Sequence, residues 1–173
     1  AQDELAALAP DVVVVAAYGK LLPAAVLETP RHGCLNLHPS LLPRHRGPSP
    51  VATAILEGDG VTGTSLMLLD QGMDTGPIIA QRQYPLSGVE TAESLTSALF
   101  QLGTMLLLEK LGPWAGGRLT AEPQEDAKAT VTRKLERADG QASWTVPAAD
   151  LERKRRAFTP WPGLFTRWQE KVL

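Results

Sequence analysis

Asp11-Val12-Val13-Val14-Val15-Ala16-Ala17 is a continuous apolar run that follows a proline and is β-branched in its middle. Such a run is typical of a strand that is buried on both faces of a parallel sheet. Residues 3–8, just before it, have the composition of the last turns of a helix. Residues 34–38, between Gly33 and Pro39, predict a second short strand. The two strands predict a sheet with at least one buried, parallel member.

The rest of the chain alternates between further strands and helices. Ser49 and Pro50 predict a helix start, with serine as N-cap and proline at the first helical position. Thr91 begins the most regular helix, and Gly112-Pro113 is expected to end it. Its apolar face consists of Leu95, Leu99, Leu102 and Leu106. Other predicted elements are a helix over residues 51–56, strands over 62–69 and 77–84, and a basic helix over 147–158. This order predicts an α/β fold with a mostly parallel sheet and flanking helices.

Length and composition set broad limits. A chain of 173 residues suits one domain with a short appendage. A change in composition near Gly112 divides it into residues 1–112, which include the sheet, and residues 113–173, a connecting segment in which residues 114–130 are loop-like. The net charge of −2 argues against a strongly basic nucleic-acid binder but leaves local basic patches open. The single cysteine, Cys34, excludes an internal disulfide and is expected to pack as a small apolar group. The cytosol is therefore the expected compartment, and no apolar run reaches the ~18 residues of a membrane span.

Asn36 and His38 are the first candidates for chemistry. They lie two residues apart on a predicted strand, so their side chains project to the same face. They also lie at the carboxyl end of that strand, where ligands bind in open α/β sheets. Taken alone, an Asn-x-His pair more often satisfies loop backbone groups than forms a site.

Two loops add to this pair. The first loop, which we call the proline-rich loop, contains four prolines from Pro39 to Pro50. They stiffen it, so it can hold a ligand at little entropic cost. Asp70-Gln71-Gly72-Met73-Asp74-Thr75-Gly76 predicts a tight turn with exposed backbone amides. This second loop lacks the ligand spacing of a calcium loop, and the three histidines and one cysteine show no zinc spacing. We therefore expect no metal.

The two loops together resemble a known family. L-N-L-H-P-S-L-L-P-R-H-R-G, from Leu35, resembles the signature of the formyltetrahydrofolate-dependent formyltransferases, and D-Q-G-M-D-T-G-P-I, from Asp70, resembles their second signature. The spacing between the two also fits, and the resemblance covers nearly the whole chain. R-G-P-S-P-V (46–51) and R-A-F-T-P-W-P-G (156–163) are similar to the members that act on methionyl-tRNA. Compared with these members, the chain is expected to be truncated at both ends, and Ser143 stands where they often have Asp.

The resemblance implies a Rossmann-like formyltransferase fold with a C-terminal connecting arm that leads toward a further domain. It also implies 10-formyltetrahydrofolate as the co-substrate. Asn36, His38 and Asp74 match the catalytic trio of the family. The stretch that contacts the folate matches Ser40, Leu41, Leu42 and Pro43. The loop that encloses the pteridine matches Asp70, Gln71, Gly72 and Met73, together with Asp74.

The chemistry is consistent with such a trio. The acceptor amine attacks the formyl carbon, and the carbonyl oxygen becomes an oxyanion. Asn36 can donate a hydrogen bond to that oxygen. His38 can either donate to the oxygen or accept the proton of the amine, because its ordinary pKa lies near neutrality. Asp74 can accept a hydrogen bond from His38 and relay protons.

The resemblance implies the amino group of initiator methionyl-tRNA as acceptor, in a monomeric cytoplasmic enzyme of translation initiation with no membrane partner. Alternatives within the family are a glycinamide ribonucleotide or sugar-nucleotide formyltransferase or a formyltetrahydrofolate-hydrolysing domain. An alternative of another class is a silent folate-binding fragment. Residues 156–163 argue against the purine enzyme. Arg44, Arg46 and residues 153–156 are the cations available for tRNA phosphates, and Trp161 is expected to be a packing anchor.

Overall fold

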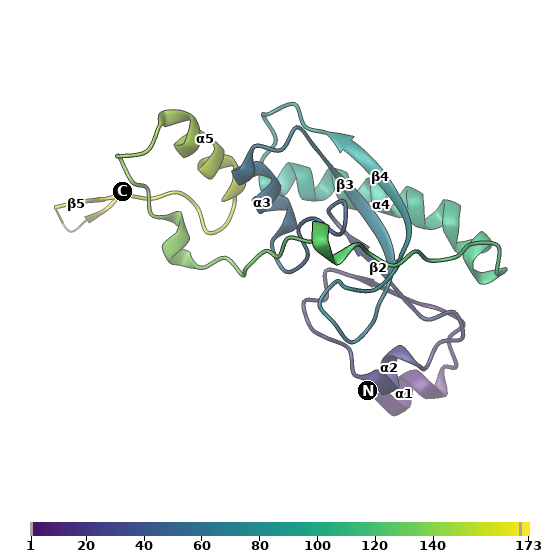
Figure 1. Ribbon diagram of the computed structural model, residues 1–173. Helices are drawn as coiled ribbons and strands as arrows, with labels where there is room; N and C mark the ends of the chain where they lie inside the picture. Colours follow the sequence, from purple (N-terminus) through teal and green to yellow (C-terminus); the bar gives the residue numbers. More distant parts are fainter. Residues whose placement is uncertain (1, 170) are drawn as a thin grey trace.

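β2 (Cys34–His38) lies inside the main sheet, and the site described below is built around its carboxyl end (Figure 1). The structure, a computed structural model, describes residues 2–169 and 171–173. The main sheet has the strand order β1-β2-β3-β4, and β5 and β6 form a separate pair. The remaining strands are β1 (Val13–Ala16), β3 (Val61–Leu68), β4 (Ile78–Pro85), β5 (Arg167–Trp168) and β6 (Lys171–Val172). The helices are α1 (Gln2–Ala7), α2 (Ala24–Leu27), α3 (Pro50–Glu57), α4 (Ala92–Ala115) and α5 (Ala148–Ala157).

The main sheet is mixed, which corrects the expectation of a mostly parallel one. β1 and β2 are parallel, whereas β2–β3 and β3–β4 are antiparallel. β3 and β4 are joined by residues 69–77 alone, and a parallel crossover needs a dozen residues or more. The expected α/β class, its flanking helices and the predicted strands are confirmed.

β1 is half-exposed, although its sequence predicted burial on both faces. Its residues alternate between partly buried and exposed, and Val14 is 42% exposed. β1 lies at the edge of the described sheet and pairs only with β2 within it. The apolar run therefore forms the expected parallel strand without being covered on both faces in the described part of the chain.

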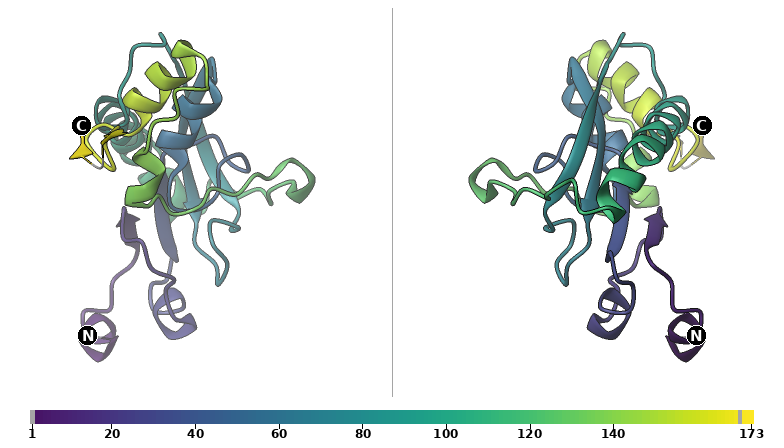
Figure 2. Two further views of the ribbon diagram at one scale, coloured as in Figure 1. Left: turned by 90° about the vertical axis from the view of Figure 1, so that its left-hand side faces the viewer. Right: turned by 90° about the vertical axis from the view of Figure 1, so that its right-hand side faces the viewer.

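α4 covers one face of the sheet (Figures 1 and 2). It starts with a capping box, in which the Thr91 hydroxyl accepts from the Ser94 N–H and the Ser94 hydroxyl accepts from the Thr91 N–H. The predicted apolar face is confirmed, because Leu95, Leu99 and Leu106 are at most 1% exposed. None of the described helices, α4 included, is long and apolar enough to cross a membrane.

α4 does not end at Gly112-Pro113 as expected but continues to Ala115. A proline removes one backbone donor, and this costs less in the last turn than in a helix interior. Trp114 also ties that turn to the sheet, because its indole N–H donates to the His32 carbonyl at 2.9 Å, next to β2.

Two apolar clusters surround α4. Between the sheet and the helix, Leu35 and Leu37 of β2 pack with Leu66 and Leu106. Between α3, α4 and α5, the cluster consists of Val51, Ala52, Ile55, Leu95, Leu99, Ala157 and Phe158. Because Leu35 and Leu37 occupy the α4 side of β2, the alternation along the strand directs Asn36 and His38 away from this core.

The segment after α4 crosses the opposite face of the sheet (Figures 1 and 2). We call residues 122–132 of this segment the strap. Its ends are fixed by isolated backbone bridges, Glu122 to Ile78 and Val131 to Arg46. The segment has the predicted loop-like character, with a short 3-10 helix over Asp126–Lys128, and these bridges join it to β4 and to the proline-rich loop.

Replacing Leu106 with Ala should lower the free energy of unfolding by roughly 2–5 kcal/mol, because a fully buried leucine leaves a cavity in the cluster behind β2. Leu108→Ala is the matched control on the same helix, since Leu108 is 72% exposed and should change stability by less than about 0.5 kcal/mol. Urea denaturation followed by circular dichroism measures both. Equal losses in the two variants would contradict the burial assigned to α4.

Candidate active site

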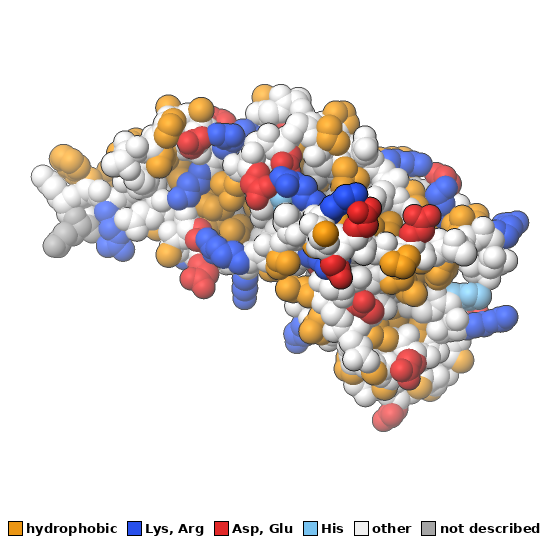
Figure 3. All heavy atoms as spheres, in the orientation of Figure 1, with side chains coloured by type: hydrophobic (Ala, Val, Ile, Leu, Met, Phe, Trp, Pro, Cys, Tyr) orange, Lys and Arg blue, Asp and Glu red, His pale blue; other side chains and the backbone are white. Residues whose placement is uncertain are grey.

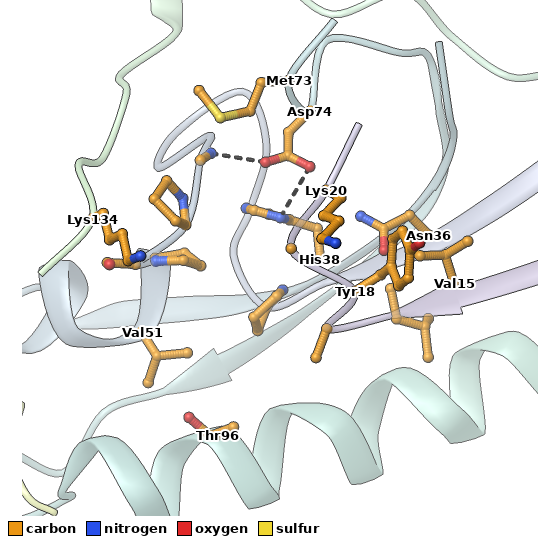
Figure 4. Close-up of a pocket in the computed structure, with 18 of the residues that line it drawn as sticks. Val15, Tyr18, Lys20, Asn36, His38, Val51, Met73, Asp74, Thr96 and Lys134 are labelled. Carbon is orange, nitrogen blue, oxygen red and sulfur yellow. Dashed lines mark hydrogen bonds and ion pairs between the residues drawn. The ribbon is translucent and has the colours of Figure 1, made fainter. Parts of the chain in front are cut away.

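A cavity of about 710 Å³ opens at the carboxyl end of β2 (Figure 4). Asn36 and His38 reach it from β2, and Asp74 reaches it from the loop between β3 and β4. Other walls come from residues after β1, from the start of α3 and from the side of α4. These include Tyr18, Gly19, Lys20, Leu21, Leu22, Pro50, Val51, Thr96 and Phe100. The structure therefore brings the three residues singled out in the sequence to one cavity, as their spacing predicted.

Asn36 presents its carboxamide to this cavity. It lies between Leu35 and Leu37, which face the core, and it pairs in register with Val15 of β1 and Met67 of β3. No side-chain hydrogen bond is formed by this carboxamide within the described part of the chain. Its N–H groups are therefore available to a ligand oxygen in the cavity.

The His38 ring is held between two groups. Its Nε2 lies 2.9 Å from the carbonyl oxygen of His45, and its Nδ1 lies 3.6 Å from Oδ1 of Asp74. A carbonyl oxygen only accepts hydrogen bonds, so Nε2 carries a proton. In the neutral ring Nδ1 is then the free base, and it faces the Asp74 carboxylate. A proton arriving at Nδ1 would form an imidazolium beside that carboxylate.

Burial sets the protonation of His38. The residue is only 4% exposed, and this desolvation lowers its pKa below the ordinary 6.5. The Asp74 charge and the bond to His45 act in the opposite direction, but burial has the larger effect. His38 is therefore neutral at pH 7, with Nδ1 ready to accept a proton.

Residues 70–76 form a turn, which we call the Asp74 turn, and hydrogen bonds to neighbouring residues fix its conformation. Asp74 has a left-handed backbone with φ of 56°, and its Oδ2 accepts from the Gly47 N–H at 2.8 Å. Asp70 closes the same turn through bonds from the Gly72 N–H and the Thr75 hydroxyl, which confirms the predicted tight turn. A Cβ at position 76 would collide with the Leu68 carbonyl oxygen, so only glycine allows the turn to approach β3 this closely.

His45 positions the His38 ring by accepting a hydrogen bond at its backbone carbonyl. The sequence did not reveal this role. Its backbone is left-handed, with φ of 62°, and its ring is buried. The ring is anchored through Nε2, 2.8 Å from Oδ2 of Asp59. Anchoring the ring also holds the backbone conformation that aims the carbonyl at His38. A polar side chain in the turn after the strand that carries Asn36 and His38 was the only sequence signal, and it did not distinguish this role from a solvated loop.

His45, Glu57 and Asp59 form a cluster whose potential metal-ligand atoms lie within 4.8 Å of one another. The Arg44 guanidinium pairs with both carboxylates, so a cation of the chain already neutralises them. We interpret this cluster as an ion-paired anchor for the proline-rich loop. Because Arg44 is used in this way, it is a poor candidate for the tRNA contact suggested from sequence.

Residues 40–43 do not line the cavity. Ser40 and Leu42 are buried, and their backbones bond to Ser65 of β3, with the Ser65 hydroxyl donating to the Ser40 carbonyl at 2.7 Å. The Leu41 side chain lies against Gly63 of β3. Gln71 is exposed and also lies outside the cavity lining, whereas Asp70, Gly72 and Met73 lie within it. Folate contacts by Ser40, Leu41, Leu42, Pro43 and Gln71 remain predictions.

Several cavity residues were missed or misjudged. Residues 18–22 follow the carboxyl end of β1, and the rule applied to β2 could have identified them. Lys134 and Trp161 approach from the C-terminal region without a local signal. Trp161 is 53% exposed and lines the cavity, so the expectation that it is a packing anchor is wrong.

Comparison with protein families identifies the class of this fold and cavity. Residues 1–111 match the family model described as "Formyl transferase", and residues 134–173 match "Formyl transferase, C-terminal domain". The chain belongs to the formyl transferase family, as its two loop motifs indicated.

Among the curated relatives that the chain matches are methionyl-tRNA formyltransferases. The methionyl-tRNA formyltransferase of Chloroflexus aggregans is 51% identical over 171 residues, which cover 99% of this chain and 55% of the relative. That of Roseiflexus sp. (strain RS-1) is 53% identical over 166 residues, which cover 96% of this chain and 51% of the relative. The chain thus spans about half the length of the curated relatives it matches.

Solved structures share the fold. HypX from Aquifex aeolicus in complex with tetrahydrofolic acid has a TM-score of 0.85 at 21% identity, covering 99% of this chain and 30% of that one. A 4-N formyltransferase from Francisella tularensis has a TM-score of 0.85 at 16% identity, covering 99% and 72%. At these identities the likeness establishes the formyltransferase fold alone.

Asp74→Asn should lower the pKa of His38 further. The Asp74 charge raises this pKa, so its removal leaves the effect of burial less opposed. The pH of half-protonation, followed by NMR of the ring C–H signals, should therefore move downward, while His32, outside the cavity, serves as internal control. An unchanged or higher pKa for His38 would contradict the coupling between the two side chains.

Proposed function

We propose that this protein transfers the formyl group of 10-formyltetrahydrofolate to the amino group of initiator methionyl-tRNA, through a tetrahedral intermediate. The observation that carries the proposal is the convergence of Asn36, His38 and Asp74 on one cavity in a chain of the formyl transferase family. The curated relatives named above, about half identical over nearly the whole chain, support methionyl-tRNA as the acceptor.

The reaction follows from the groups on the cavity wall. The neutral amine attacks the formyl carbon while His38 Nδ1 accepts the proton that the amine loses. Asn36 donates to the oxygen as it becomes negative, and Asp74 stabilises the imidazolium. His38 then returns the proton to N10 of the folate as the bond from the formyl carbon to N10 breaks. His38 thus acts first as base and then as acid, and no metal is required.

The cavity suits a folate. Its volume of about 710 Å³ lies in the range of small-molecule sites. Two loop segments, residues 18–22 and 69–74, line the cavity near Asn36 and Asp74. Their backbone N–H and carbonyl groups can form hydrogen bonds with the edge of a pterin ring. We place the pterin there. We further propose residues 1–112 as the catalytic domain and residues 113–173 as a connecting segment that leads into the C-terminal domain, whose family model residues 134–173 match.

Most of the cations first suggested from sequence for tRNA contacts are already paired with carboxylates of the chain. Arg46 pairs with Asp126, and the arginines of residues 153–156 pair with Asp150 or Glu152. Figure 3 shows Lys and Arg side chains spread among acidic ones over the half that carries α5 and the C-terminal end. Lys20 and Lys134 line the cavity, and in the described part of the chain neither ammonium group is ion-paired. We propose these two for the acceptor end of the tRNA.

To test the acceptor, the full-length protein is incubated with labelled formyl donor and one acceptor at a time. The acceptors are methionyl-tRNA, glycinamide ribonucleotide and an amino sugar nucleotide. Transfer to methionyl-tRNA is expected, with affinity that falls steeply as salt rises because phosphate contacts release counterions. Transfer to a small acceptor with none to methionyl-tRNA would overturn the acceptor assignment.

A chelator should not reduce the rate of formyl transfer. Activity that is lost with the chelator and returns only when zinc is added would contradict metal-free chemistry.

Asn36→Ala should lower kcat by ~10²–10³-fold with little change in KM, because its amide acts on an oxyanion that exists only near the transition state. Steady-state kinetics of the full-length enzyme separate the two constants. Gln101→Ala, on the exposed surface of α4, is a control that should leave both unchanged. If kcat survives in Asn36→Ala, Asn36 is not the oxyanion donor.

A further inference from the structure

Gln124 of the strap holds the Asp74 turn from outside the cavity. Its carboxamide nitrogen donates to the Asp74 carbonyl at 2.8 Å and to the Gly76 carbonyl at 2.7 Å. These two carbonyls belong to the turn that contains the left-handed Asp74 and the tightly packed Gly76. One side chain therefore closes the turn by using both N–H donors of a primary amide.

Arg46 sets the orientation of this carboxamide. Its Nε donates to Oε1 of Gln124 at 3.0 Å, and its Nη2 pairs with Asp126 at 2.8 Å. Arg46 is 7% exposed, so it has little freedom to release Gln124. With the carboxamide oxygen facing a guanidinium, the NH₂ group must face the two carbonyls, which fixes the assignment of O and N.

The same strap holds the other side of the catalytic pair. The Arg46 N–H donates to the Thr130 carbonyl at 2.9 Å, and the Thr132 N–H donates to the Arg46 carbonyl at 2.7 Å. Arg46 stands between His45, whose carbonyl holds His38, and Gly47, whose N–H holds Asp74. Both partners of the His38–Asp74 pair are thus positioned by residues 124–132, all of which lie between the two regions that match family models.

We propose that Gln124 is a positioning residue for the formyl transfer reaction, which keeps the Asp74 carboxylate facing Nδ1 of His38. This inference rests on the proposed function, in which Asp74 stabilises the His38 imidazolium. Gln124 does not line the cavity and is not expected to touch either substrate. Its loss should let the turn relax and move the carboxylate away from His38.

The test uses Gln124→Met, which keeps the length of the side chain but removes its donors, with Gln101→Met as the exposed control on α4. We expect kcat to fall roughly tenfold or more while KM changes little, because small misplacements of catalytic groups are costly. The His38 pKa, measured by NMR with the signal assigned through His38→Gln, should fall in the same direction as in Asp74→Asn. The other titratable groups near His38 are unchanged in these variants. They are His45, which bonds to the ring, and the cavity-lining Tyr18, Lys20, Asp70 and Lys134.

Gln124→Glu is a second variant that can still accept from Arg46 but, as a carboxylate, cannot donate to the turn. It should reproduce the fall in kcat expected for Gln124→Met, whereas its added negative charge opposes the fall of the His38 pKa, so that pKa is compared only in Gln124→Met. Wild-type kcat in both Gln124→Met and Gln124→Glu would overturn the proposal, as would a loss of kcat in Gln124→Met with an unchanged His38 pKa. A protein that transfers no formyl group even without substitution would contradict the proposed function instead, and the His38 pKa would still test the positioning role.

Discussion

The contact of His38 with the His45 carbonyl on one side and the Asp74 carboxylate on the other is the interaction on which the site depends. A buried imidazole is costly unless its polar atoms have partners. Meeting this requirement forces two loops, one after β2 and one after β3, into fixed positions around a ring supplied by the strand. Left-handed backbones at His45 and Asp74 are strained conformations for such residues, and they persist because surrounding contacts hold them.

Those contacts come from outside the sheet. Asp59 anchors the His45 ring, and Gln124 grips the Asp74 turn. The strap belongs to the segment that leaves α4 and crosses the face of the sheet, so this segment holds the geometry of the His38–Asp74 pair as well as joining two regions of the chain. Any movement of the strap would displace the contacts of both His38 and Asp74, because the backbone of Arg46 connects the strap to the residues that bond to each of them.

Local sequence predicted much of the architecture. β2 and α4 follow from short-range patterns of polarity and capping, and the leucines of α4 are buried as their spacing indicates. The errors share a cause. Each error depends on which neighbours an element meets in the fold. The errors concern the exposure of β1, the antiparallel pairing of β3 and β4, and the continuation of α4 past Pro113. Neighbours distant in sequence leave no local pattern, because packing and pairing partners are chosen by the whole fold.

The sequence by itself determined which side chains share a face of β2, since period-two alternation directs Asn36 and His38 to one side and Leu35 and Leu37 to the other. Its motifs also indicated the family. Only the tertiary structure decided which atom of His38 is free to act as base, because the carbonyl that occupies Nε2 comes from a loop whose shape other segments set. It also decided that residues 40–42 pack against β3 while residues 18–22 line the cavity. Side-chain type is written in the chain, but the partner of each polar atom depends on backbone positions fixed by long-range contacts.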